Sequence, residues 1–351
     1  MSDGEGGPLA AVLARLIAAT GPISVAHYMA ESNARYYGRR DPLGAAGDFV
    51  TAPEISQMFG ELIGLWLTDV WARAGRPEPA HYVELGPGRV TLARDALRAA
   101  RHAGLEPSIH FVETSPALRA LQGERFPAAE RHDDLSTLPE LGPLLVVANE
   151  FLDALPVRQF VRTPRGWRER MVGLDGERLA FVAGAPPMDA ALPARWRDAP
   201  EGAIVETCPA AAAVVGEVAR RLAAQGGAAL FVDYGHASPR RGSTLQAVRA
   251  HRKVDPLAAP GEADLTAHVD FAALAQAAQA QGARWCGTVS QGGFLRALGI
   301  ETRAAALAAA DPGQAAATER AKQRLIGDGA MGGLFKAMAL THPGWPDPAG
   351  F

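Results

Sequence analysis

The sequence predicts an α/β fold, in which helices cover a mostly parallel sheet and an antiparallel β subdomain is added to it. Short apolar segments alternate with helical segments between residues 82 and 148, a pattern typical of a parallel sheet. Three closely spaced strand candidates joined by turns follow between residues 157 and 182, which indicates an antiparallel meander. With 351 residues, the chain is long enough for one large domain or two modest ones.

The composition argues against several classes of protein. The net charge of −3 gives no overall preference for nucleic acid. Cys208 and Cys286 are too few for a disulfide framework. No apolar run reaches the roughly 20 residues that span a bilayer. The N-terminus lacks the basic segment of a secretory signal. We therefore expect a cytoplasmic protein, with a processed organellar form left open.

The N-terminal quarter is expected to be helical around one long loop. Helices are predicted for Leu9 to Ala19 and for Val25 to Ser32, the second capped by Ser24. Tyr36 to Ser56 is rich in Gly and Pro and is predicted to be a loop, and loops of this length are commonly functional. Gln57 to Ala74 is predicted to be an amphipathic helix.

The remaining elements follow from apolar runs and helical periodicity. The predicted strands, read from the sequence, are 82–85, 109–113, 144–148, 157–163, 167–174, 178–182, 228–233 and 283–289. The predicted helices are 91–103, 116–125, 211–224 and 270–281, with a mainly helical stretch from 300 to 340 that ends in an apolar segment. We expect a helical N-terminal region at 1–78 and a core at 79–351. Within the core we expect an inserted subdomain at roughly 157–208 and helical segments at roughly 291–328.

A glycine-rich turn follows the first predicted strand. In "VELGPGRV" the strand carries Glu84 to its carboxyl end, and Gly86 and Gly88 allow the backbone to approach a ligand closely. Ligands of open α/β sheets bind beyond the carboxyl ends of the strands. Alone, this signal is weak, because many such glycines only make a tight turn.

The second predicted strand, "IHFVETS", strengthens the interpretation as a binding site because it ends in Glu113. An acid at this position can accept hydrogen bonds from ribose hydroxyls. A nicotinamide site would favour a third glycine where this chain has Thr91. The pattern E-x-G-x-G suits S-adenosylmethionine instead, with its amino-acid tail held by the glycine loop.

Further polar residues follow the other strand ends. Asp134 lies where it could reach an adenine amino group, Asn149 and Glu150 end the fourth strand, and Asp233 ends a later one. Acids at strand ends are also common as helix caps or solvated loop residues, and that interpretation stays open for Asp133 and Asp153. It is weaker for Glu150, which follows a buried strand at the edge where ligands bind.

The segment "ADLTAHVDF" resembles a run of metal ligands, with Asp264, Thr266, His268 and Asp270 at close spacing. No second set of ligands is evident, and methyl transfer requires no metal. We therefore expect no metal site, and we expect His268 to serve structure or substrate contact.

Taken together, several motifs resemble the MidA family of S-adenosylmethionine-dependent methyltransferases. They are "GDFVTAPEISQMFGELIGLWL", "VELGPGRVTLARDALR", "HFVETSPALR", "VVANEFLDALPVRQF", "GWRERMVGLD", "GGAALFVDYGH", "TLQAVRAHR" and "ADLTAHVDF". The resemblance covers roughly residues 20 to 340, in order, and "DFVTAPEISQ" and "NEFLDALPV" are specific to it.

The resemblance implies a Rossmann-like class I methyltransferase core with a helical N-terminal region and an inserted β subdomain. It implies S-adenosylmethionine as cofactor, S-adenosylhomocysteine as product, and methylation of a protein arginine on a respiratory complex I subunit or a similar protein. We expect a protein partner and no nucleic acid, and a homodimer is compatible with the helical surface. The alternatives are a non-catalytic assembly or chaperone protein, a nucleotide-dependent oxidoreductase, and a methyltransferase of small molecules or lipids.

Motifs and strand ends together give the predicted site. Arginine is protonated at neutral pH, so carboxylates are needed to orient it and to offset charge as its proton leaves. The predicted catalytic residues are Glu150, Glu54 and Asn149. The predicted cofactor contacts are Glu84, Gly86, Pro87, Gly88, Glu113, Thr114, Asp134, Leu135 and Asn149. The predicted substrate and loop residues are Asp48, Phe49, Thr51, Pro53 and His268, and helix N-capping is the alternative role for Asp48 and Glu54.

Val90 departs from the family pattern, whose loop usually reads GPGRG. A β-branched side chain is ill suited to a positive φ and adds bulk beside the cofactor. Val90 is thus the feature that favours a non-catalytic protein. If the loop is functional, Val90→Gly is expected to tighten cofactor binding.

Overall fold

The computed structural model describes residues 9–39, 50–249 and 252–351, and the chain divides into two compact units. Unit 1 comprises Met1–Pro42, Ala154–Ala210 and Pro239–His268. Unit 2 comprises Leu43–Asp153, Ala211–Ser238 and Val269–Phe351. The division expected at residue 78 therefore falls inside unit 2, since the helix that precedes it packs into the core of that unit.

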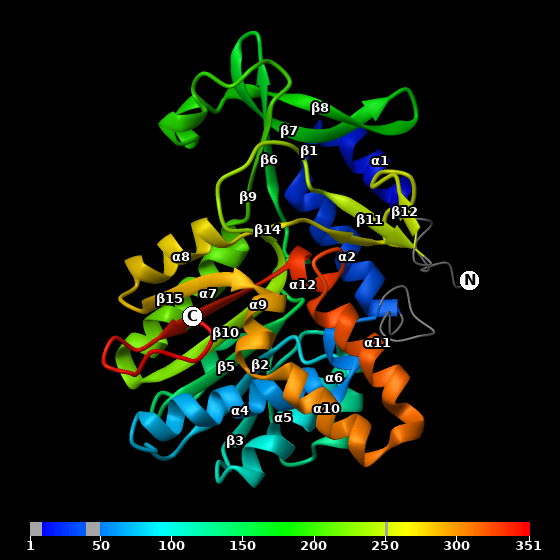
Figure 1. Ribbon diagram of the computed structural model, residues 1–351. Helices are drawn as coiled ribbons and strands as arrows, with labels where there is room; N and C mark the ends of the chain where they lie inside the picture. Colours follow the sequence, from blue (N-terminus) through cyan, green and yellow to red (C-terminus); the bar gives the residue numbers. More distant parts are fainter. Residues whose placement is uncertain (1–8, 40–49, 250–251) are drawn as a thin grey trace, which may run out of the picture. The chain divides into compact units, whose positions relative to one another are not determined.

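Unit 2 contains the predicted parallel sheet (Figure 1). Its strand order is β15-β16-β10-β5-β2-β3-β4, and β14 adds to β10. The central strands are parallel, whereas β16 runs antiparallel to β10 and β15. The strands are β2 (His81–Leu85), β3 (Ser108–Val112), β4 (Glu130–His132), β5 (Leu144–Asn149), β10 (Gly227–His236), β14 (Val269–Asp270), β15 (Arg284–Ser290) and β16 (Phe335–Thr341). This order places the switch point of the sheet, where ligands bind, between β2 and β5.

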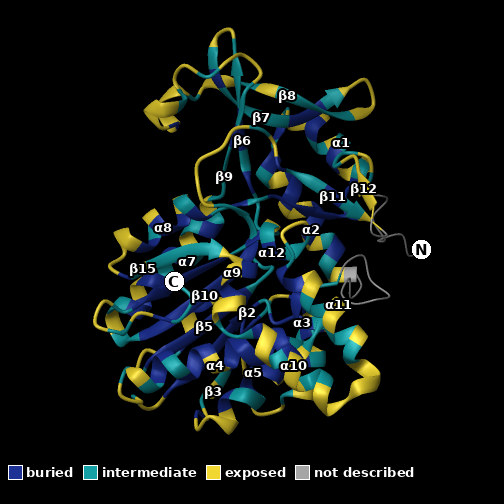
Figure 2. Cartoon of the chain, viewed as in Figure 1, coloured by how far each residue is buried: buried dark blue, intermediate teal, exposed yellow. Residues whose placement is uncertain are grey.

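The strands at the centre of this sheet are buried on both faces, as Figure 2 shows for β2, β5 and β10. Every residue of β2 is buried, and β5 is buried except for its last residue. The sequence of β5 is a nearly continuous apolar run, because a parallel sheet covered by helices has no solvent face, whereas β2 also buries His81 and Glu84. The sequence pattern therefore predicts these strands well.

Helices flank the sheet of unit 2. They are α3 (Ala52–Ile55), α4 (Gln57–Arg73), α5 (Thr91–His102), α6 (Pro116–Arg125), most of α7 (Pro209–Gln225), α8 (Phe271–Ala280), α9 (Gln291–Ala297), α10 (Ile300–Ala310), α11 (Ala315–Ile326) and α12 (Met331–Leu334). The 3-10 helices η1 (Leu135–Thr137) and η4 (Pro312–Gln314) complete the unit.

Helices α4 and α5 pack closely because α4 carries glycine at the contact. A Cβ atom at Gly64 would lie 2.1 Å from the carbonyl oxygen of Ala96 in α5. Nearby, the buried Glu61 accepts hydrogen bonds from Arg98 at 2.9 Å and from Arg303 at 2.7 Å. This charge-assisted network ties α4 to α5 and to α10.

Unit 1 joins the N-terminal helices to the predicted meander. It contains α1 (Leu9–Thr20), α2 (Val25–Arg39), β1 (Ile23–Ser24), β6 (Arg158–Thr163), β7 (Gly166–Asp175), β8 (Arg178–Pro187), β9 (Ile204–Thr207), η2 (Asp189–Ala191) and η3 (Ala194–Trp196). Strands β6, β7 and β8 form an antiparallel sheet with β1 and β9. A second sheet comprises β11 (Gln246–Arg249), β12 (Arg252–Val254) and β13 (Asp264–Thr266), and the sequence patterns did not predict it.

The predicted loop from Tyr36 to Ser56 is partly helical. Helix α2 continues to Arg39, beyond its predicted end, and the short helix α3 lies at Ala52–Ile55. Within the described residues, no helix combines the length and the apolar character needed to cross a membrane.

Candidate functional site

The glycine loop between β2 and α5 has an unusual backbone. Gly86, Gly88 and Val90 have φ values of 64°, 50° and 57°, in the left-handed region. The N–H of Val90 donates to the carbonyl oxygen of Pro87 at 2.8 Å, which closes the turn. At Gly86 an added Cβ atom would lie 2.8 Å from Cδ2 of Phe151. Glycine is thus required at this position by both backbone conformation and space.

Val90 adopts the strained conformation that its position in the loop predicts. Left-handed geometry costs an L-residue roughly 1–2 kcal/mol. The side chain is 2% exposed and belongs to the core cluster beneath the loop, together with Leu92 and Ala93 of α5. Burial of this valine offsets the strain. The described core contacts therefore remove the main reason for regarding Val90 as a sign of a degraded site.

Glu113 follows β3 and is held beside the glycine loop. Its carboxylate accepts a hydrogen bond from the N–H of Ser115 at 2.9 Å and one from Nε2 of Gln122 at 3.4 Å. Nε2 of Gln122 also donates to the carbonyl oxygen of Gly88 at 3.0 Å. Burial raises the pKa of Glu113. The next residue, Thr114, is exposed.

Gln122 is a site residue that the sequence reasoning missed. It lies in α6, is fully buried, and links Gly88 to Glu113. No motif or periodicity distinguishes it, because the contact joins residues 34 positions apart. Its Oε1 has no hydrogen-bond partner among the described residues.

Glu84 lies inside β2 and is buried with Tyr82 on the same face of the strand. The hydroxyl of Tyr82 donates to Oε2 of Glu84 at 2.6 Å. Burial raises the pKa of Glu84 to about 8. The side chain is therefore largely protonated at neutral pH.

The acids after β4 have local partners in the structure. Asp134 is the N-cap of η1, and its Oδ1 accepts from the N–H of Ser136 at 2.7 Å. Hydrogen bonds from the hydroxyl and the N–H of Ser136 lower the pKa of Asp134. Leu135, which follows, is buried. Asp133 forms an ion pair with Arg119. The capping interpretation thus describes Asp134 in the structure, whereas its contact with adenine stays a prediction.

Glu150 occupies the most distinctive position of the site, at the carboxyl end of β5. Its φ of 53° is left-handed, which is rare for a non-glycine residue. Its Oε1 accepts from the N–H of Ala52 at 2.9 Å and from Nδ2 of Asn149 at 3.1 Å. The pKa of Glu150 is raised to about 7, mainly by burial and to a smaller extent by the charge of Glu54. Oδ1 of Asn149 is buried and has no hydrogen-bond partner among the described residues.

The segment before α4 brings Glu54 to the glycine loop. Glu54 lies in the first turn of α3, and its Oε1 is 3.7 Å from Nη1 of Arg89. Thr51 is the N-cap of α3, and Pro53 is buried in its first turn. The N-cap of α4 is Ser56, whose side chain accepts from the N–H of Met58. Helix capping of α4 is therefore not the role of Glu54. Asp48 and Phe49 lie outside the described residues.

Asp233, at the end of β10, fixes the turn that follows Glu150. Its Oδ2 accepts from the backbone N–H groups of residues 151, 152 and 153 at 3.2, 2.9 and 3.2 Å. The sequence pointed to Asp233 as a polar strand end but did not predict this function. Because these N–H groups are neighbours of Glu150, Asp233 positions the end of β5.

His268 belongs to unit 1, unlike the residues above. Its backbone N–H donates to Oγ1 of Thr244 at 2.9 Å, and its ring lies 3.5 Å from Nη1 of Arg240. In the same sequence segment, Asp264 accepts a hydrogen bond from Tyr37 and Asp270 is the N-cap of α8. These contacts are local, and a substrate contact of His268 stays a prediction.

The chain resembles methyltransferases in sequence and structure. A family profile described as "Putative S-adenosyl-L-methionine-dependent methyltransferase" matches residues 62–289. A crystal structure of a Burkholderia thailandensis protein bound to S-adenosyl-homocysteine aligns with a TM-score of 0.83 and 32% identity, over 97% of this chain and 95% of that chain.

Curated relatives support the same family. The mouse protein named "Protein arginine methyltransferase NDUFAF7, mitochondrial" is 39% identical, over 89% of this chain and 77% of its own length. The zebrafish (Danio rerio) protein of the same name is 38% identical, over 94% of this chain and 86% of its own length.

These relatives also correct one expectation. The cytoplasmic location inferred from the N-terminus is contradicted, because the relatives are named as mitochondrial proteins. The profile covers more than half of the chain, and the aligned structure and both relatives are more than 30% identical to it. The chain therefore belongs to this family of S-adenosyl-L-methionine-dependent methyltransferases.

Proposed function

We propose that this methyltransferase methylates a guanidinium nitrogen of arginine in a protein substrate, and that Glu150 binds the guanidinium. The observation that carries the proposal is the position of Glu150. It is a half-buried carboxylate in left-handed backbone at the end of β5, and it adjoins the glycine loop through Phe151 and Gly86. Strained residues of this kind cluster at functional sites.

The relatives support the substrate class, because the mouse and zebrafish proteins are named protein arginine methyltransferases. A respiratory complex I subunit or a similar protein is the substrate that the motifs suggested, and it remains part of the proposal. Homodimer formation and the lack of a nucleic-acid partner also stay predictions.

The residues around the glycine loop fit S-adenosylmethionine. Gly86 and Gly88 keep the backbone of the loop free of side chains. A side chain at Gly86 would contact Phe151, and a side chain at either position would require a strained, left-handed φ. The first turn of α5 has no side-chain cap, so its N–H groups suit a carboxylate. Glu113 offers carboxylate oxygens for ribose hydroxyls, and Oδ1 of Asn149 is an acceptor for an ammonium group.

The cofactor, when bound, supplies an electrophilic methyl group on a sulfonium. The protein has to align the nucleophilic nitrogen and receive the proton that the guanidinium loses. The pKa of Glu150, about 7, leaves a large ionised fraction at neutral pH. In that form it can accept two guanidinium N–H groups. We assign Glu54, whose charge acts on Glu150, as the second carboxylate of the substrate site.

The test combines a binding and a turnover assay. Labelled S-adenosylmethionine is incubated with arginine-containing protein from mitochondrial extract, and the labelled residue is mapped by mass spectrometry. Glu150→Gln keeps a carbonyl oxygen for the N–H of Ala52 and should bind S-adenosylhomocysteine like the parent chain while losing turnover. Label on arginine supports the proposed substrate. Label on another residue type, or unimpaired turnover by Glu150→Gln, contradicts the proposal.

A further inference from the structure

Three histidines from neighbouring strands form a row in unit 2, beside the cofactor site but separate from its residues. Nδ1 of His81 in β2 lies 3.1 Å from Nε2 of His110 in β3. Nδ1 of His110 lies 3.1 Å from Nε2 of His132, the last residue of β4. All three residues are at least 93% buried. The parallel strands bring these rings to one face of the sheet.

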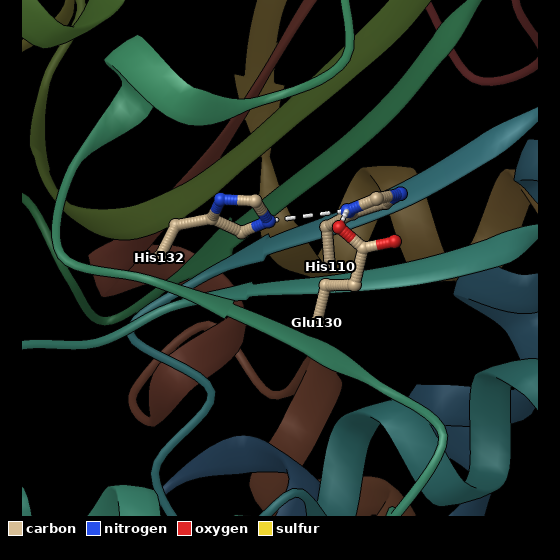
Figure 3. Close-up of side chains that lie close together, drawn as sticks. All are labelled: His110, Glu130 and His132. Carbon is tan, nitrogen blue, oxygen red and sulfur yellow. Dashed lines mark hydrogen bonds and ion pairs between the residues drawn. The ribbon is translucent and has the colours of Figure 1, made fainter.

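Glu130 adds a carboxylate to this row. It is opposite His110 in the strand register and two residues before His132, so it shares the face of β4 that carries His132. Its Oε2 lies 3.8 Å from Nδ1 of His110. Figure 3 shows the carboxylate beside the His110 ring, with the His132 ring pointing toward the same place. Single ligand atoms of the three residues all lie within 4.8 Å of one another.

From this arrangement we propose that His110, His132 and Glu130 bind a divalent transition-metal ion, and that zinc is the preferred ion. Two imidazoles and one carboxylate are a common zinc ligand set. A tetrahedral ion with bonds of about 2.0–2.1 Å holds its ligand atoms roughly 3.3–3.5 Å apart. The two nitrogens, at 3.1 Å, and the nitrogen and oxygen, at 3.8 Å, lie within a few tenths of an ångström of that spacing.

The outer hydrogen bonds suit two metal-ligating rings. A ligating histidine normally donates its other N–H to a fixed acceptor. Nδ1 of His132 lies 2.7 Å from Oγ1 of Thr137, which can accept its proton. Nε2 of His110 can donate to Nδ1 of His81, and Nε2 of His81 to the carbonyl oxygen of Leu141 at 2.9 Å. Each ligating ring thus has one nitrogen for the ion and a partner for the other.

The charge state of the site also suits a cation. Both rings are buried, and burial favours the uncharged form of imidazole. Neutral imidazole is the form that binds metal. The side chain of Glu130 is 69% exposed, which leaves its carboxylate free to move toward the ion. Glu130 and a solvent molecule would complete the coordination from the solvent side.

The ion would act on the nearby cofactor site through the backbone. The carbonyl oxygen of His132 accepts the N–H of Glu113 at 3.0 Å. An ion that joins β3 to β4 would hold this contact, and binding to the native state alone stabilises the fold. We infer a structural role for the ion, because none of its ligands is among the proposed catalytic residues.

Metal binding is tested with the untagged full-length chain after treatment with a chelator. Calorimetry should show one Zn²⁺ bound per chain and no heat with Mg²⁺, which prefers oxygen ligands. The Co²⁺ form should have the intense visible absorption of a tetrahedral site. No Zn²⁺ binding by the parent chain would overturn the proposal and would leave the histidines as a hydrogen-bonded row.

Substitutions of the proposed ligands test where the ion binds. Glu130→Gln changes an exposed side chain and should weaken Zn²⁺ binding at least about tenfold. Glu124→Gln, an equal change of charge at an exposed position in α6, is the matched control and should bind like the parent chain. The double variant His110→Ala, His132→Ala should lose binding, with circular dichroism as the check on folding. Parental affinity in both Glu130→Gln and the double variant would assign the ion to another place and refute the site.

Discussion

The ring of Phe151 lies against the backbone of Gly86, and this contact joins the end of β5 to the glycine loop. A Cβ atom at Gly86 would lie 2.8 Å from Cδ2 of Phe151, and the φ of Gly86 is 64°. Phe151 directly follows Glu150, so displacement of its ring would also move the proposed catalytic carboxylate. This contact therefore links the glycine loop to the residue that we propose to bind substrate.

Gly86→Ala is expected to weaken S-adenosylhomocysteine binding and to lower turnover. The added methyl group forces Phe151 or the loop to move, and overpacking of this kind typically costs about 1–3 kcal/mol of stability. Calorimetry with S-adenosylhomocysteine and urea unfolding give the two measurements. Gly104→Ala is the control, because Gly104 also has a positive φ of 87° but has nothing within 4 Å of an added Cβ. Equal effects of the two substitutions would show that the Phe151 contact is unimportant.

Val90→Gly is expected to lower stability by roughly 1 kcal/mol and to leave S-adenosylhomocysteine affinity unchanged. The substitution relieves left-handed strain but removes a valine side chain that is 2% exposed. This expectation reverses the one drawn from the sequence, where the side chain was assumed to lie beside the cofactor. Calorimetry and urea unfolding measure the two effects. Markedly tighter binding by the glycine variant would restore the earlier interpretation.

The contrast at Val90 shows where prediction from sequence ends. The apolar runs of β2, β5 and β10 predicted the sheet, because central parallel strands have one consistent pattern. The sheet formed by β11, β12 and β13 was missed, since its strands have three or four residues and β12 is exposed throughout. Short polar strands have no periodicity that separates them from loops.

The same limit applies to the site. Glu113 and Glu150 were predicted because strand ends mark the ligand edge of the sheet. The hydrogen-bond partner of Glu150, the N–H of Ala52, is 98 positions away in the sequence. Gln122 and Gly88, which are also hydrogen-bonded, are 34 positions apart. Such contacts depend on tertiary packing, so a single sequence does not contain a signal for them.

Turnover is expected to rise with pH through an apparent pKa near 7 if Glu150 binds the guanidinium. Burial holds the pKa of this carboxyl at about 7, and only its ionised form accepts two N–H groups. The pH dependence of kcat/KM reports the free enzyme. Because the charge of Glu54 raises the pKa of Glu150, Glu54→Gln should move the rise to lower pH. A profile that is flat between about pH 6 and about pH 8 in the parent chain would remove Glu150 from this role.

Stability is expected to fall as pH rises, because buried Glu84 carries a proton in the native state. Burial raises its pKa from 4.5 to about 8. Between these values the native chain holds a proton that the unfolded chain has released, so the free energy of unfolding decreases with pH. The contribution is complete below about pH 4.5 and is lost as pH rises through about 8. Glu150 acts in the same direction, with a pKa of about 7.

Glu84→Gln isolates the part of this dependence that belongs to Glu84. Glutamine keeps a carbonyl oxygen for the hydroxyl of Tyr82 but does not titrate, so the fall in stability between about pH 6 and about pH 9 should become shallower. It should not vanish, because Glu150 still titrates in that range. Urea unfolding of the ligand-free chain measures the slope, and Glu124→Gln at an exposed position should leave it unchanged. The contrary result is an equal dependence of unfolding free energy on pH in Glu84→Gln and the parent chain. Glu84 would then be ionised in the native state, and groups other than Tyr82 would stabilise its carboxylate.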